Sequence, residues 1–121
     1  MIHQPRPKTI DYIEMPSHDL EATRRFFAAL LGWKFDDYGP DYIAFDDGRT
    51  TGGFFRGEKS WSETISCPLI VFYASDLKAT RDQVAQLGGE VTRDVFQFPG
   101  GFRFHFRAPG SGGFAVWCEK E

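Results

Sequence analysis

The sequence predicts an α+β fold built from two copies of one strand–helix–strand–strand–strand unit. The hexapeptide at 19–24, Asp-Leu-Glu-Ala-Thr-Arg, recurs 57 residues later at 76–81 as Asp-Leu-Lys-Ala-Thr-Arg, and Gly-Gly-Phe at 52–54 recurs at 112–114. A long period that is present only twice indicates a duplicated supersecondary module, because a solenoid needs three or more repeats. Both copies also predict the same order of elements.

The first unit begins with an alternating strand at 9–15, which Pro16 is expected to end because proline cannot donate to a sheet ladder. Asp19 is a good helix N-cap and Gly32 a good helix end, so a helix is predicted between them. The three strands predicted after this helix span 33–38, 41–46 and 50–56. The pair Gly52-Gly53, which no helix follows, is interpreted as a bend or bulge.

The second unit repeats this order. A strand is predicted at 69–73, followed by a helix that Asp76 caps and Gly88-Gly89 ends. Its last three strands are predicted at 90–98, 101–107 and 114–119. We expect a single domain of 121 residues, with modules at about 9–56 and 67–119 joined by a polar linker at about 57–66.

Composition excludes several classes of function. A net charge of −3 argues against nucleic acid as a partner, because phosphate binding requires a basic face. No apolar run approaches the length of a membrane span, and the polar residues 1–8 do not resemble a signal peptide. Cys67 and Cys118 have neither CxxC spacing nor a secreted context, so we expect reduced thiols in the cytoplasm.

Several motifs of this duplicated pattern resemble one known family. They are Tyr12-Ile13-Glu14-Met15-Pro16, Arg25-Phe26-Phe27, Leu31-Gly32-Trp33 and Gly52-Gly53-Phe54. The chain resembles the vicinal oxygen chelate (glyoxalase/bleomycin resistance/dioxygenase) superfamily over about 10–119, and within it a bacterial subgroup related to lactoylglutathione lyase. The resemblance implies a mixed eight-stranded sheet curled around one cavity, with the helices outside. It also implies a homodimer, and an exposed Trp61 would suit the interface.

The resemblance also identifies where a metal would bind. In metal-using members each module supplies one ligand from its first strand and one from its last, and the ion chelates two substrate oxygens. The matching positions hold Tyr12, Leu69, Arg56 and Val116. Leucine and valine offer no lone pair and arginine repels a cation. We therefore expect no metal and no cofactor, which argues against the metal-dependent glyoxalase and dioxygenase reactions.

Strand alternation predicts which side chains line the cavity. Ile13 and Met15 should face the helix. The residues assigned to the cavity are Tyr12, Glu14, Phe54, Arg56, Leu69, Val71, Tyr73, Phe114, Val116 and Cys118. The sequence therefore predicts an apolar, aromatic pocket for a small planar or apolar molecule.

Two titratable residues are candidate catalytic groups. Glu14, a carboxylate among apolar neighbours, could act as a general base or anchor a ligand, or it could form a structural ion pair with Arg56 or another arginine. His105 lies in a run, 102–107, that alternates phenylalanine with Arg103, His105 and Arg107. If the polar side lines the cavity, it forms an anion-binding wall with an acid or base; otherwise it is a solvated surface.

Two functional hypotheses remain open. The first is a metal-independent small-molecule binder of the bleomycin-resistance type. The alternative is a metal-independent lyase or isomerase that uses Glu14 as base, with Tyr12 or His105 as its partner. A metal enzyme with Glu14 and His105 as relocated ligands is disfavoured, because two ligands are too few for a closed site. His18 is expected to have a turn role, and Cys118 to be an inert thiol.

Overall fold

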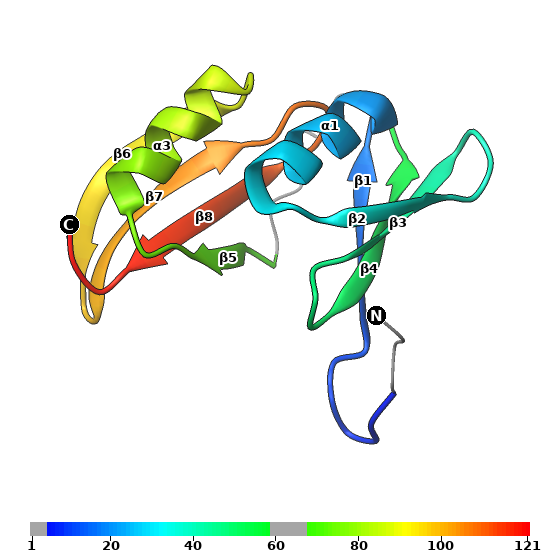
Figure 1. Cartoon of the computed structure of the whole chain (residues 1–121), viewed down its shortest axis with the longest axis horizontal. Helices are drawn as coiled ribbons and strands as arrows, with labels where there is room; N and C mark the ends of the chain where they lie inside the picture. Colours follow the sequence, from blue (N-terminus) through cyan, green and yellow to red (C-terminus); the bar gives the residue numbers. More distant parts are fainter. Residues whose placement is uncertain (1–4, 59–67) are drawn as a thin grey trace.

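A computed structural model describes residues 5–58 and 68–121, and these form an α+β fold of two βαβββ modules (Figure 1). The first module comprises β1 (Tyr12–Ser17), α1 (Leu20–Leu31), β2 (Lys34–Asp37), β3 (Tyr42–Asp46) and β4 (Thr51–Arg56). The second comprises β5 (Ile70–Tyr73), α3 (Leu77–Gln86), β6 (Glu90–Phe98), β7 (Gly101–Arg107) and β8 (Gly113–Cys118). The predicted fold class and order of elements are confirmed.

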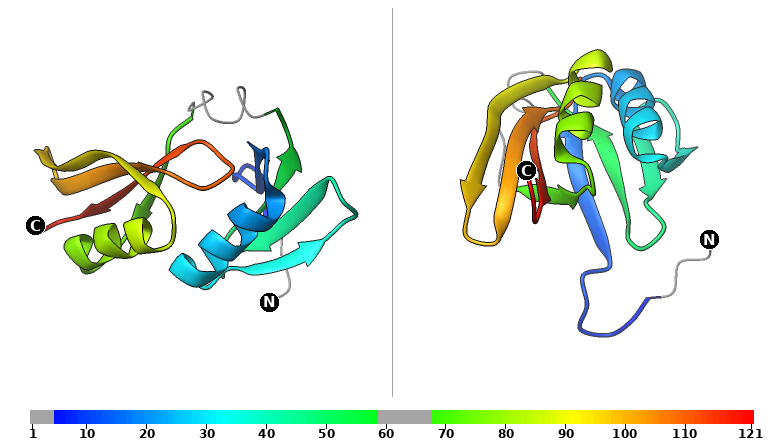
Figure 2. Two further views of the ribbon diagram at one scale, coloured as in Figure 1. Left: turned by 90° about the horizontal axis from the view of Figure 1, so that it is seen from above. Right: turned by 60° about the vertical axis from the view of Figure 1, so that its left-hand side comes forward.

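The strands of each module form their own sheet. In the described parts of the chain there are two four-stranded mixed sheets, with orders β1-β4-β3-β2 and β5-β8-β7-β6. β1 is parallel to β4 and β5 is parallel to β8, whereas the other neighbours are antiparallel. The eight predicted strands are therefore present, but the two sheets are not joined into one and do not close. The modules meet instead through their helices and one loop, and α1 and α3 lie side by side (Figure 2).

Neither of the helices in the described ranges has the length and apolar character needed to cross a membrane. The predicted linker falls largely on residues 59–67, which lie outside the described residues together with Trp61 and Cys67.

Pro16 does not end the first strand, contrary to the prediction. β1 continues through Pro16, opposite Phe55, to Ser17, opposite Arg56. Proline is tolerated because β1 lies at the edge of its sheet, where one side of the strand makes no ladder bonds.

The interpretation of Gly52-Gly53 as a bend or bulge is also wrong. Both glycines lie inside β4, which keeps a regular register with β1 and β3. They allow close approach instead, because a Cβ on Gly52 would lie 2.2 Å from the Ile13 carbonyl oxygen. The register shifts occur in β6, between Val91 and Phe96.

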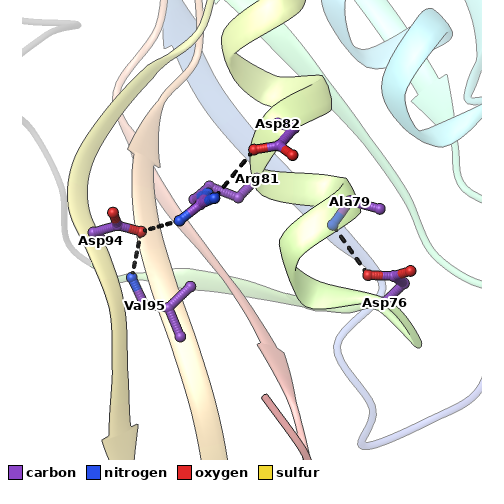
Figure 3. Close-up of polar contacts among 6 residues, drawn as sticks. All are labelled: Asp76, Ala79, Arg81, Asp82, Asp94 and Val95. Carbon is purple, nitrogen blue, oxygen red and sulfur yellow. Dashed lines mark hydrogen bonds and ion pairs between the residues drawn. The ribbon is translucent and has the colours of Figure 1, made fainter.

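The two helices begin in the same way. The Asp19 carboxylate accepts a hydrogen bond of 3.1 Å from the Ala22 N–H, and the Asp76 carboxylate accepts one of 3.0 Å from the Ala79 N–H (Figure 3). Each aspartate thus satisfies one of the free N–H groups at its helix start, as predicted. α1 ends at Gly32, whose φ of +71° is the left-handed conformation that glycine adopts readily.

The duplication extends to an ion pair that ties each helix to the strand after it. Arg81 donates through Nη1 to Asp94 of β6 at 2.9 Å (Figure 3), and Arg24 pairs in the same way with Asp37 of β2. The Arg81 hydrogen bond, together with one from the Val95 N–H, holds the pKa of Asp94 below its usual range. These pairs are largely exposed, so they orient the helices more than they stabilise them.

One aromatic side chain of α1 joins the two cores. Phe27 is 0 % exposed. Its ring centroid lies 5.7 Å from that of Phe54 in β4, 5.3 Å from that of Phe114 in β8, and 6.1 Å from that of Phe72 in β5. Phe54 and Phe114 are the phenylalanines of the two Gly-Gly-Phe repeats, so Phe27 packs between equivalent positions of both modules.

Hydrogen bonds between the two modules, which we call the polar joint, add to this aromatic contact. The loop between β7 and β8 contacts the turn between β1 and α1 through three hydrogen bonds. The His18 N–H donates to the Gly110 carbonyl oxygen at 2.7 Å, and Thr23 Oγ1 donates to the Pro109 carbonyl oxygen at 2.7 Å. Ser111 Oγ donates to the Pro16 carbonyl oxygen at 2.8 Å. Gly110 has a φ of +79°, and a Cβ there would lie 2.7 Å from the Asp19 carbonyl oxygen. Only glycine therefore fits this contact without strain.

Truncation of the shared ring should destabilise the whole molecule. We expect Phe27→Ala to lower the free energy of unfolding by about 3–5 kcal/mol, because it leaves a cavity that both modules line. Urea denaturation followed by circular dichroism measures this effect, with Tyr38→Ala as a control, since Tyr38 is 65 % exposed. A loss below about 1 kcal/mol, or the appearance of two separate transitions, would contradict the shared-core interpretation.

Candidate functional site

Each sheet has one face packed under its helix and a second face turned away from it, which we call the open face. On the first sheet the register places Glu14 opposite Gly53, and Gly53 opposite Ala44 of β3. Since paired residues point to the same side, Tyr12, Glu14, Tyr42 and Gly53 belong to the open face. Met15 pairs with Phe54 and packs against the core, as predicted.

Three side chains on this face form a directed hydrogen-bond chain. The Tyr42 hydroxyl donates to Glu14 Oε2 at 3.0 Å, and the hydroxyl oxygens of Tyr12 and Tyr42 are 2.6 Å apart. A phenol carries a single hydrogen, so Tyr12 must donate to Tyr42, which in turn donates to Glu14. The chain therefore leaves the lone pairs of the Tyr12 oxygen available to an incoming hydrogen-bond donor.

Gly53 is required for this arrangement. A Cβ at position 53 would lie 2.1 Å from the Tyr42 hydroxyl oxygen and 2.8 Å from that of Tyr12. Tyr42 was not among the predicted site residues, because it comes from β3, a strand that is not adjacent to β1. The signal that could have found it is a glycine inside a strand, since such a glycine often marks close approach of another group.

Tyr42 is held in its protonated form. Burial first, and then the hydrogen bonds with Tyr12 and Glu14, raise the pKa of Tyr42 above its usual range. The phenol is thus a donor throughout the neutral range, and the direction of the chain is kept.

A cavity of about 480 Å³ lies in the seam between the edge strands β1 and β5, and we call it the seam pocket. Its wall is mostly apolar and includes Ile10, Ile13, Met15, Ile70 and Phe114. Tyr12 and Glu14 are also among the residues that line it. The pocket therefore combines an apolar lining with one end of the hydrogen-bond chain.

The predicted facing of the module-closing strands is wrong. Phe54 and Val116 are buried on the helix side, and Phe114 packs on that side against Phe27, although it also reaches the seam pocket. The physical reason is register. Glu14 pairs with Gly53 and Val71 pairs with Ala115, so the residues one position later point the other way.

Arg56 is not a neighbour of Glu14. Its Nε lies 3.0 Å from Asp41 Oδ1, and its Nη2 donates to the Pro40 carbonyl oxygen at 2.7 Å. Within the described residues, the side-chain partner of Glu14 is Tyr42 and not an arginine. The alternative of a structural ion pair for Glu14 is thus not what the structure shows.

On the second sheet, Val71 and Tyr73 lie on the open face, as predicted, and are 41 % and 53 % exposed. Tyr73 donates a hydrogen bond to Glu119, which raises the pKa of Tyr73 to about 12 and lowers that of Glu119. Leu69 is half-buried and directly precedes β5. These residues lie outside the lining of the seam pocket.

The structure shows which side of the alternating 102–107 strand packs under the helices and which side lies on the open face. Phe104 and Phe106 are buried under the helices, and Phe106 packs on Phe26 of α1. Arg103, His105 and Arg107 consequently lie on the open face. His105 is half-buried, and burial, followed by the charges of Arg103 and Arg93, lowers its pKa. His105 is not among the described residues that line the seam pocket with Glu14.

His18 has the turn role expected of it, whereas the inertness of the Cys118 thiol stays a prediction. His18 lies in the turn between β1 and α1, and its backbone N–H takes part in the joint with Gly110. Cys118 is buried on the helix side, with Sγ 3.7 Å from the Ser75 carbonyl oxygen. Its predicted place on the cavity face is wrong for the same reason of register as that of Val116.

Among the described residues, the family's metal positions on the open faces carry few atoms that could bind a divalent ion. The closing strands present Gly53 and Ala115 there, in place of Arg56 and Val116. With Tyr12 and Leu69 from the opening strands, the family's positions offer one phenol oxygen, whereas a divalent ion requires several oxygen or nitrogen ligands. Over residues 5–58 and 68–121, no three His, Cys, Asp or Glu side chains gather closely enough to hold a metal.

Solved structures with the same arrangement come from several bacteria. The chain is similar to a lactoylglutathione lyase from Agrobacterium tumefaciens, with 19% identity over 93% of this chain and 95% of that one and a TM-score of 0.69. It is similar to the fosfomycin resistance protein FosX from Mesorhizobium loti, with 17% identity, coverages of 93% and 92% and a TM-score of 0.74. A FosX mutant from Listeria monocytogenes gives 15% identity, coverages of 96% and 93% and a TM-score of 0.77.

At these identities the solved structures establish a common fold. No curated protein matches the chain by sequence. The family model that matches describes the Glyoxalase/Bleomycin resistance protein/Dioxygenase superfamily and covers residues 9–117, which is nearly the whole chain. Together with the two βαβββ modules, this match shows that the chain belongs to the glyoxalase/bleomycin resistance protein/dioxygenase superfamily.

Proposed function

We propose that the protein binds a small planar or apolar organic molecule in the seam pocket without using the metal of its superfamily. The observation that carries this proposal is the pocket itself, whose volume of about 480 Å³ falls in the range of small-molecule sites. An apolar wall with a few well-placed polar groups is the usual composition of such a site.

The hydrogen-bond chain narrows the ligand further. Tyr12 gives its only hydrogen to Tyr42, so towards the pocket it can act only as an acceptor. Glu14 is also an acceptor when it is ionised. We therefore expect the ligand to present a hydroxyl or N–H group to this wall and apolar surface to the rest of the pocket.

A second candidate function is a metal-independent lyase or isomerase with Glu14 as general base. It is favoured by the hydrogen bonding of Glu14, because Tyr42 occupies Oε2 and, among the described residues, no partner occupies Oε1. A carboxylate held by one oxygen in this way could take a proton from a substrate with the other. Tyr12 is the nearer candidate partner, since His105 lies on the open face of the other sheet.

The activities of similar proteins do not transfer directly. The Listeria FosX structure contains Mn(II) and 1S,2S-dihydroxypropylphosphonic acid. In this chain the positions on the open faces hold tyrosine, glycine, leucine and alanine, which are unsuited to such an ion. We therefore propose a ligand that is held by the protein's own groups.

Substitutions in the hydrogen-bond chain of Tyr12, Tyr42 and Glu14 distinguish a binding function from a catalytic one. Once a panel of planar aromatic compounds has been screened for thermal stabilisation, Tyr42→Phe should weaken the best ligand about fivefold, because it removes one hydrogen bond and frees Tyr12 to donate. Glu14→Gln should change affinity by less than about tenfold if the protein only binds, but should lower turnover by about 10²- to 10⁴-fold if Glu14 is a base.

The matched control for these variants is Tyr38→Phe, which removes a hydroxyl from an exposed tyrosine outside the pocket. It should leave affinity unchanged. If Tyr42→Phe and Tyr38→Phe have the same affinity for every stabilising compound, the seam pocket is not the binding site.

Metal analysis tests the other half of the proposal. Protein that is purified without chelators or an affinity tag should contain less than about a tenth of an equivalent of divalent metal, because the described residues of the open faces offer too few ligand atoms. Elemental analysis by mass spectrometry measures this content. Near-stoichiometric metal would contradict the proposal and would direct attention to metal-dependent chemistry.

We also propose a homodimer. Within the described residues, the edge strands β1 and β5 have unpaired edges, the exposed apolar side chain of Ile10 lies beside β1, and an exposed sheet edge can pair with a second copy. Sedimentation velocity should give twice the chain mass of 13.8 kDa, and Ile10→Lys should reduce it to the monomer, whereas Tyr38→Lys should not. A monomeric wild type at micromolar concentration would contradict this proposal.

The cytoplasm remains our proposed location. The support is the free thiol of Cys118, which suits a reducing compartment.

A further inference from the structure

The open face of the second sheet concentrates positive charge around aromatic rings. The guanidinium carbon of Arg93 lies 3.5 Å from the centroid of the Phe96 ring. The guanidinium carbon of Arg103 lies 5.4 Å from the same centroid and 5.2 Å from that of Phe98. The His105 ring is next to Phe96, with its centroid 5.6 Å away. Two cations and a histidine are thus held in place by stacking.

These two arginines differ from most others in the molecule. Among the described residues, the arginines with a carboxylate partner are Arg24, Arg25, Arg56, Arg81 and Arg107. Within the described ranges, Arg93 and Arg103 have no carboxylate at ion-pair distance. Arg103 Nε and His105 Nε2 are also buried without a hydrogen-bond partner in the part of the chain that the structure describes.

Such a cluster is unfavourable without a counter-charge. Like charges repel, and a buried polar atom without a partner loses the hydrogen bond that it would make with water. A bound anion would relieve both costs at once, because it would accept hydrogen bonds from Arg103 and offset the charge of Arg93. The aromatic rings keep the guanidinium groups positioned before the anion arrives.

A hollow next to the cluster can take the body of a ligand. It has a volume of about 330 Å³ and is lined by Val71, Phe98, Pro99, Gly100, Arg103 and Trp117. Apart from Arg103 the wall is apolar or aromatic, and Trp117 packs edge-on against Phe98. Arg103 therefore belongs both to the hollow and to the charged cluster.

We propose that the open face of the second sheet is a binding site for a small organic anion, a carboxylate on a planar ring, with the ring in this hollow and the carboxylate at Arg103. Arg93 and His105 lie beside that carboxylate. The net charge of −3 disfavours a polyanion and favours a small ligand. The site is separate from the seam pocket, so it does not depend on the function proposed there.

Benzoate is a suitable probe, because it combines a planar ring with one carboxylate, and benzamide is its neutral counterpart. Titration followed by ¹H–¹⁵N NMR should show saturable binding of benzoate, centred on β7 and on the turn at 99–100, and at least about tenfold weaker binding of benzamide. Arg103→Gln should weaken benzoate about tenfold, and Arg93→Gln should weaken it less, because Arg93 lies beside the carboxylate and outside the hollow.

His105 gives an independent readout. Burial and the two arginines lower its pKa in the free protein, and a bound carboxylate opposes the effect of the arginines. Benzoate should therefore raise the pKa of His105, which the ring protons report by NMR. The other charged groups beside this face are Arg107, which pairs with Glu90, and Glu119, which accepts a hydrogen bond from Tyr73, and they should contribute little.

Controls make the outcome decisive. Arg49→Gln removes the same charge from the turn between β3 and β4 and should leave benzoate affinity unchanged. If Arg103→Gln does not fold, Arg103→Lys keeps the charge but loses the planar fork and should bind with intermediate affinity. Equal binding of benzoate and benzamide, or equal loss with Arg49→Gln, would overturn the proposal.

Discussion

The packing of Phe27 between the two modules is the contact on which the rest of the structure depends. Its ring touches Phe54 of one sheet and Phe114 of the other, so it sets how closely the two sheets approach each other. That approach in turn determines the width of the seam between β1 and β5, where the pocket lies. The position related to Phe27 in α3 is Val84, a smaller buried residue. A large ring contributed by α1 therefore serves both halves of a duplicated fold.

The two modules are alike where they are held together and different where they could bind a ligand. Helix caps and the Arg–Asp pairs from helix to strand occur in both, at equivalent positions. The open faces differ in charge and in chemistry. The first carries a carboxylate and two phenols, and the second carries cations stacked on aromatic rings. The two modules thus have open faces of similar geometry, with an acidic group at the centre of the first and basic groups on the second.

Local signals in the sequence were sufficient for the order of elements but not for the facing of every strand. Asp19, Gly32 and Asp76 mark helix ends through interactions within a few residues, and the structure confirms them. Whether Phe54 or Gly53 points to the open face depends on the register between β1 and β4, which distant residues determine. The contact of Tyr42 with Glu14 is of the same kind, because it joins strands that are 28 residues apart and crosses Gly53. The facing of His105 likewise depended on which side of β7 the helices cover.

The joint between the β7–β8 loop and the β1–α1 corner has a consequence for how the protein is made. Phe114 packs on Phe27, Pro109 accepts a hydrogen bond from Thr23, and Ser111 donates one to Pro16. Phe114, Pro109 and Ser111 all lie close to the other end of the chain. During synthesis the first module leaves the ribosome well before these partners, with an aromatic surface still uncovered. We therefore expect the first module to complete its packing only when β8 has emerged, and its aromatic surface to stay exposed until then.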